Sequence, residues 1–118
     1  MESMTAITRL SALAQDSRLA VFRLLVKAGR GGMAAGEVAR ALDIPANTLS
    51  AQFSVLAHAG LVTSRRDGRS IIYAADYDRM SELLVYLMED CCQGRAEVCA
   101  PLVVAATACC AQPQGSPS

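Results

Sequence analysis

The segment from Asp43 to Gly60 restricts the fold of this chain more than any other stretch. Pro45 fits the first turn of a helix or the residue just before it, and Gly60 fits a cap just past the end. Apolar residues recur between them at helical spacing. The predicted buried face is made by Leu49, Phe53, Leu56 and Ala57. The outward positions carry no acid and are small or neutral: Asn47, Thr48, Ser50, Ala51, Gln52, Ser54 and His58.

The outward face of this helix allows two interpretations. Small, neutral hydrogen-bonding side chains suit a helix that lies in a groove of DNA. An ordinary amphipathic surface helix has the same pattern. A predicted helix over 35–42 precedes the segment, and the short connection 43–45 joins the two. This order predicts a helix-turn-helix unit, which favours the first interpretation.

A β-hairpin is predicted directly after Gly60. Two β-prone runs surround the pair Asp67-Gly68, whose residues tolerate the positive φ angles of a type I′ turn. Arginine at such a tip can attract phosphate groups, or it can keep a solvated edge from aggregating. Three arginines lie at or near the predicted tip: Arg65, Arg66 and Arg69.

Three further helices are predicted, over 5–15, 17–28 and 77–90. Asp16 or Ser17 could cap the second of them. The last helix has a wide apolar stripe, which indicates a homodimer interface with the first helix as the second contributor. Expected buried positions in the first two helices are Ile7, Leu10, Leu13, Ala14, Leu19, Val21, Phe22, Leu25 and Val26. The predicted fold class is mainly α with a small β-hairpin wing.

Length and composition favour one helical domain. With 118 residues, 53% hydrophobic but only 4% aromatic, the chain suits alanine-rich helix packing and an additional buried interface. We expect a folded domain over 1–99 and a Cys-containing, flexible tail over 100–118. No apolar run reaches the roughly 20 residues of a membrane span, and no secretory signal opens the chain. A cytoplasmic protein with no membrane partner is expected.

The charge distribution bears on the partner. Formal net charge is zero, which by itself argues against a nucleic-acid partner. Residues 1–72, however, hold nine bases and five acids, whereas residues 73–118 hold two bases and six acids. The first part therefore has the excess positive charge that DNA attracts.

These elements in this order resemble the ArsR/SmtB family of winged helix-turn-helix repressors. The matching segments are 13–19, 47–50 with 56–62, and 65–69, and the resemblance covers about 12–99. It implies a homodimer that binds an inverted-repeat operator in double-stranded DNA, with the helix of 45–59 in the major groove and the wing beside it. Gln52 could pair with adenine, although many relatives carry His at this position.

Members of this family sense metals at different places. The zinc type uses His and carboxylates on the terminal helix, but the single histidine of this chain, His58, lies on the predicted recognition helix. Another type uses a Cys-x-Cys segment at the start of the third helix, where this chain reads Met33-Ala34-Ala35-Gly36-Glu37. Neither pattern is present.

All five cysteines follow residue 90. Cys91, Cys92 and Cys99 lie within nine residues, and a chain that turns at Gly94 can bring their sulfurs together. Three thiolates suit a soft centre such as As(III) or Sb(III), and the arrangement resembles that of arsenite-responsive members. Alternatively, Cys91 packs as a small hydrophobe and the others are incidental. Cys109 and Cys110 are candidates for auxiliary thiols.

Other signals and another class of function stay open. The repressor could respond to methylated trivalent arsenic through two thiols, or to thiol oxidation or persulfidation. An arsenate reductase or thiol carrier would need an oxyanion-binding loop around a nucleophilic cysteine, and no such loop flanks a cysteine here. We therefore expect a regulator and no enzyme.

Overall fold

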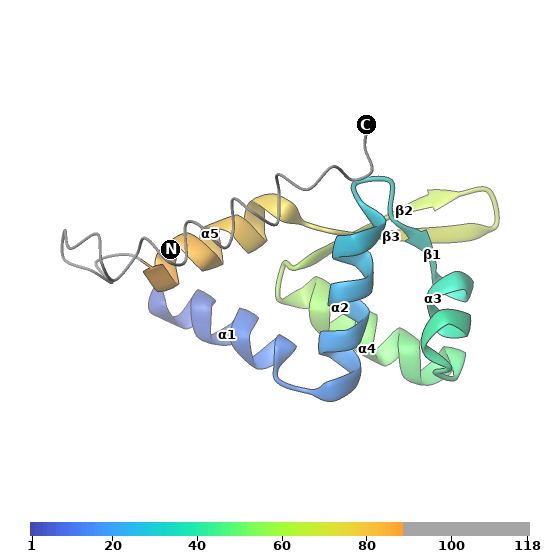
Figure 1. Cartoon of the computed structure of the whole chain (residues 1–118), viewed down its shortest axis with the longest axis horizontal. Coiled ribbons are helices and arrows are strands. Elements are labelled where there is room, and N and C mark those ends of the chain that lie inside the picture. Colours follow the sequence, from blue (N-terminus) through green and yellow to red (C-terminus); the bar gives the residue numbers. More distant parts are fainter. Residues whose placement is uncertain (89–118) are drawn as a thin grey trace. The chain divides into compact units, whose positions relative to one another are not determined.

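The computed structural model describes residues 1–88, and the contacts divide the chain into Met1–Tyr86 and Leu87–Ser118. Figure 1 shows the helices and strands of the described residues. The expected tail over 100–118 and all five cysteines lie outside the described residues. The elements are α1 (Ser3–Leu13), α2 (Asp16–Ala28), β1 (Met33–Ala34), α3 (Ala35–Leu42), α4 (Ala46–His58), β2 (Val62–Asp67), β3 (Ser70–Ala75) and α5 (Tyr77–Met88). The mainly helical fold with a small wing is confirmed.

The core forms around α2. Val21 and Leu25 of this helix are fully buried, as are Val38 of α3 and Leu56 of α4. Leu61, just after α4, completes the cluster from the side of the hairpin. A buried leucine or valine contributes roughly 1.5–3 kcal/mol to folding, so this cluster fixes α3 and α4 as one unit against α2.

The sheet has three antiparallel strands in the order β1-β3-β2. Asp67 pairs with Ser70, so the two turn residues are Gly68 and Arg69. Gly68 has a φ of 64°, whereas the φ of Arg69 is not positive. A positive φ at the first turn residue alone is the pattern of a type II′ turn. The prediction of a type I′ turn at Asp67-Gly68 is therefore wrong. The turn is of type II′, and its two central residues are Gly68 and Arg69. The short strand β1, which pairs Met33 with Tyr73, was not predicted.

Helix ends follow local rules, with one correction. At the end of α4, the N–H of Gly60 donates to the carbonyl of Ala57 and the N–H of Leu61 donates to that of Leu56. This is the Schellman arrangement, and Gly60 has the positive φ of 82° that it requires. The cap of α2 is neither Asp16 nor Ser17: the side chain of Gln15 accepts from the N–H of Arg18.

Burial of α1 differs from the prediction. Its buried residues are Ala6, Arg9 and Ala12, whereas Ile7 and Leu10 are exposed. Small residues let α1 approach its neighbours closely, and one layer of helices leaves the larger side chains uncovered. Three other expected core positions, Ala14, Leu19 and Ala57, are also exposed. No helix within residues 1–88 has the length and hydropathy of a membrane span.

Candidate nucleic-acid interface

The outward face of α4 is exposed as predicted, with one exception. Gln52 is half-buried. The other predicted contact residues of this helix are exposed: Asn47, Thr48, Ser50, Ala51, Ser54 and His58. A stretch of small polar side chains along one helix face is accessible to a partner.

The amino-terminal end of α4 is electropositive. Its first turn contains no acid, and its cap residue, Pro45, makes no side-chain cap hydrogen bond. Asn47 accepts from the N–H of Thr48 at 3.0 Å. Free N–H groups and the helix dipole give such an end a partial positive charge, which favours a negatively charged partner.

The wing carries the predicted arginines in two situations. Arg65 donates to the carbonyl of Gly31 at 3.2 Å, so its guanidinium is already held by the loop before β1. Arg66 and Arg69 are exposed and make no hydrogen bond or ion pair with a described residue. These two side chains are therefore the ones available to phosphate groups.

The wing and α4 are joined by packing. The rings of Phe53 and Tyr73 stack with an interplanar angle of 4°. The two rings line a cavity of about 350 Å³ together with Ser50 of α4 and with Arg69 and Ser70 of the hairpin. Because the aromatic stack fixes the hairpin to the helix, the arginines and the polar face of α4 act as one surface.

The far end of α4 faces another part of the molecule. Ser54 and His58 line a cavity of about 640 Å³ together with Ile7, Ser11 and Arg18 of the first two helices. The predicted contact residues thus fall into two groups, one beside the wing and one beside α1. Ser50 belongs to the first group, and His58 to the second.

Gln52 is the one predicted contact residue of α4 whose side chain is bonded to another helix. Its side-chain oxygen accepts from Arg18 at 3.2 Å, a residue 34 positions earlier in the chain. The oxygen keeps a second acceptor site, but this hydrogen bond holds the amide against α2 and so restricts the orientations that a base contact requires. Sequence reasoning overlooked Arg18, although it lies in the segment 13–19 that carries the family resemblance.

The predicted metalloid site falls outside the structure. Cys91, Cys92 and Cys99, and the candidate auxiliary residues Cys109 and Cys110, all lie in 89–118. Within residues 1–88, no three His, Cys, Asp or Glu side chains are grouped so that they could hold a metal ion.

Comparison with known proteins agrees with this architecture. A family described as a helix-turn-helix domain matches residues 13–65. The chain is 36% identical over 75 residues to a biofilm growth-associated repressor of Agrobacterium fabrum, an alignment that covers 64% of this chain and 62% of that protein. It spans 61–62% of the length of the curated relatives it matches.

Solved structures extend the similarity. NolR from Sinorhizobium fredii is 33% identical, with 74% of this chain and 84% of that chain covered and a TM-score of 0.60. The homodimeric winged helix-turn-helix DNA-binding domain of Mb0332 from Mycobacterium bovis, a possible ArsR-family transcriptional regulator, is 28% identical over 73% and 80% of the chains, with a TM-score of 0.58. A possible transcriptional regulator for arsenical resistance is 28% identical over 67% and 79%, with a TM-score of 0.59.

Three findings coincide: the matched helix-turn-helix segment, the arginine-bearing hairpin after α4, and similarity over 80% of the winged helix-turn-helix domain of Mb0332. The chain belongs to the ArsR family of winged helix-turn-helix transcriptional regulators.

Proposed function

We propose that this protein is a metalloid-responsive transcriptional repressor. It binds operator DNA as a homodimer and leaves the DNA when As(III) or Sb(III) binds its carboxy-terminal cysteines. The observation that carries the DNA-binding part is the exposed, acid-free face of α4, joined by the Phe53–Tyr73 stack to a hairpin that bears Arg66 and Arg69.

In the proposed complex, α4 lies in the major groove and the wing contacts the adjacent backbone. Asn47, Thr48 and Ser50 are the candidates for base or phosphate contacts, because amides and hydroxyls can pair with either. Arg66 and Arg69 supply phosphate attraction. A two-fold dimer would place two such helices about one turn of DNA apart, or a multiple of it.

The homodimer is proposed from the apolar surface of α1 and α5. Met4, Ile7 and Leu10 are exposed on α1, and Leu84 and Val85 are exposed on α5. Large apolar side chains at this density are unusual on a surface that faces water. A second copy of the chain would cover these side chains. The similar protein Mb0332 is described as homodimeric.

The proposed inducer site consists of Cys91, Cys92 and Cys99. Arsenous acid, As(OH)₃, can exchange its three hydroxyl groups for three thiols: the S–H and As–O bonds break, As–S and O–H bonds form, and three waters leave without any redox change. Soft sulfur ligands favour such a centre over hard cations such as magnesium or calcium. Similarity to a possible regulator for arsenical resistance supports the same class of signal.

A mobility-shift assay on the promoter of the protein's own gene tests this function. Wild-type protein should bind, and arsenite should release it with a coupling of about 1–3 kcal/mol, or roughly 5- to 150-fold in affinity. Cys92→Ser and Cys99→Ser should bind equally well but stay bound when arsenite is added. Cys109→Ser and Cys110→Ser are the matched variants that test the auxiliary role.

Parallel titrations separate the other signals. Methylarsenite needs only two thiols. If methylarsenite still releases a variant that lacks one of the three cysteines, a methylated inducer is favoured. Release by oxidant without metalloid would favour thiol oxidation. Normal release of either single serine variant by arsenite would contradict the three-thiolate site.

A further inference from the structure

Arg18 joins three helices through one side chain. It lies near the start of α2, and its Nε donates to the carbonyl of Ala12 in the last turn of α1 at 2.7 Å. Its Nη1 donates to the Oε1 of Gln52 in α4 at 3.2 Å. The carbonyl of Ala12 is one of those that a helix end leaves without an intrahelical partner, so Arg18 also satisfies the end of α1.

This contact determines which end of Gln52 is free. A guanidinium group has only donors, so the amide oxygen of Gln52 must be the atom that faces it. The amide nitrogen makes no hydrogen bond with a described residue, and the half-buried side chain lies between the outward face of α4 and the core. Such a residue is better placed to fix the helix than to read a base pair.

Packing between α1 and α4 is open. The cavity of about 640 Å³ separates parts of the two helices, with Ile7 and Ser11 on one side and Ser54 and His58 on the other. The small residues Ala6 and Ala12 make the buried face of α1 together with Arg9. Because few large apolar side chains hold α1 here, its hydrogen bonds contribute more than usual to its position.

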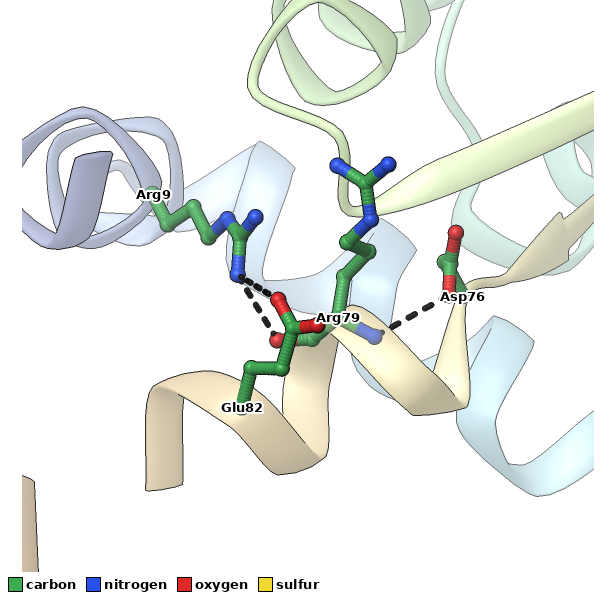
Figure 2. Close-up of polar contacts among 4 residues, drawn as sticks. All are labelled: Arg9, Asp76, Arg79 and Glu82. Atoms are coloured by element: carbon green, nitrogen blue, oxygen red, sulfur yellow. Dashed lines mark hydrogen bonds and ion pairs between the residues drawn. The ribbon is translucent and has the colours of Figure 1, made fainter. Parts of the chain in front are cut away.

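A second arginine ties α1 to α5. Figure 2 shows Arg9 reaching from α1 to the backbone of Arg79 and the side chain of Glu82 in α5. Its Nη1 donates to the carbonyl of Arg79 at 3.0 Å and to the carboxylate of Glu82 at 3.3 Å. Arg9 is only 4% exposed, whereas Glu82 is 57% exposed. Arg9, in the middle of α1, therefore links this helix to α5, and Arg18 links the carboxy-terminal end of α1 to α4.

We infer that Arg18 and Gln52 are positioning residues for DNA binding: they set the orientation of α4 relative to α1, and Gln52 reads no base. This inference rests on the proposed function. Because Arg9 fixes α1 to α5, a displacement of α5 would reach α4 through α1.

A double-mutant cycle on operator affinity tests the pair, with Arg18→Met, Gln52→Met and the combined variant. Each single change should weaken binding about tenfold, the value of a hydrogen bond to a charged group. The combined variant should bind no more weakly than the weaker single variant, since both changes break the same contact. Arg23→Met, on the exposed side of the same helix, is the matched control and should bind as wild type.

Base preference distinguishes a positioning role of Gln52 from direct reading of a base. Operators selected from randomised half-sites should have the same sequence profile for Gln52→Met as for wild type. Circular dichroism at the binding temperature checks that each variant is folded. Should Arg18→Met be unfolded, Arg18→Lys replaces it, because lysine keeps the charge without the fork that contacts Ala12 and Gln52 together.

A second cycle tests the link through α1. Glu82→Ala should weaken operator binding a few-fold in the wild-type background. In a protein that already carries Arg18→Met, the same change should not weaken operator binding further. The two side chains share no hydrogen bond among the described residues, so independent effects would simply add.

The outcomes separate the inference from the function. Additive effects in either cycle, or a changed preference at one base pair in Gln52→Met, would overturn the inference while the protein still bound DNA. Failure of wild-type protein to bind any operator would overturn the proposed function, and the inference with it.

Discussion

Individual arginines of the wing have different tasks, although the sequence places them within five residues. Arg65 is held by the carbonyl of Gly31 and so stabilises the loop before β1. Arg66 and Arg69 are exposed and bind no described residue. Their guanidinium groups are free to replace the counterions that surround a phosphate backbone.

Salt dependence measures this difference. Arg66→Ala and Arg69→Ala should each weaken operator binding and reduce the slope of log Kobs against log salt by about 0.9 per arginine, hence by about two for a dimer. Fluorescence anisotropy at several salt concentrations gives the slope. Arg65→Ala should change it less, and Arg23→Ala should leave it unchanged. If all four variants had the salt slope of the wild-type protein, the wing would make no phosphate contact.

At the scale of elements, the hairpin depends on its third strand. Gly32, just before β1, has a φ of 76°, and a Cβ at this position would collide with the carbonyl oxygen of Tyr73 in β3. Neither problem arises at Gly31, where a Cβ would meet nothing within 4 Å. Adjacent glycines thus have unequal structural roles.

Substitution of the two glycines tests this. Gly32→Ala should lower the free energy of unfolding by at least about 2 kcal/mol, because the backbone must shift and a positive φ is costly for alanine. Gly31→Ala should stay within about 1 kcal/mol of wild type. Urea denaturation followed by circular dichroism gives both values. A similar loss in both variants would refute the steric explanation.

At the scale of the whole molecule, residues 1–88 present large exposed apolar side chains on α1 and α5. Leu84 is 52% exposed and Val85 is 64% exposed on α5, and exposed side chains of α1 add to the apolar surface. The buried residues of these helices are Ala6, Arg9 and Ala12 on α1 and Leu83 on α5. This distribution is what a helix pair needs if a second copy completes the layer.

A charge in this face should separate the protomers. We expect Val85→Glu to be monomeric by light scattering after size exclusion, with native circular dichroism, because a carboxylate would be buried in the interface without a partner. Operator affinity should fall by about 10²-fold, since the half-sites would then bind independently. Ala41→Glu, exposed on α3, should remain dimeric. A dimeric Val85→Glu would place the interface elsewhere.

Local sequence signals determined most of the elements. Gly60 predicted the end of α4 because a positive φ at this position is a property of the chain segment itself. The helix periodicity of 45–59 and the turn near Gly68 are equally local, and they carried the family resemblance. The exact turn residues, Gly68 and Arg69, depended on the strand register, which local patterns do not specify.

Only the tertiary structure decided which side chains are free. Gln52 has the sequence pattern of an outward residue, but Arg18, 34 positions earlier, occupies its amide oxygen. Ile7 and Leu10 have the pattern of a core, but α1 packs through Ala6, Arg9 and Ala12. Spacing along one helix reports which residues share a face, whereas the neighbour that this face meets is set by contacts between distant segments.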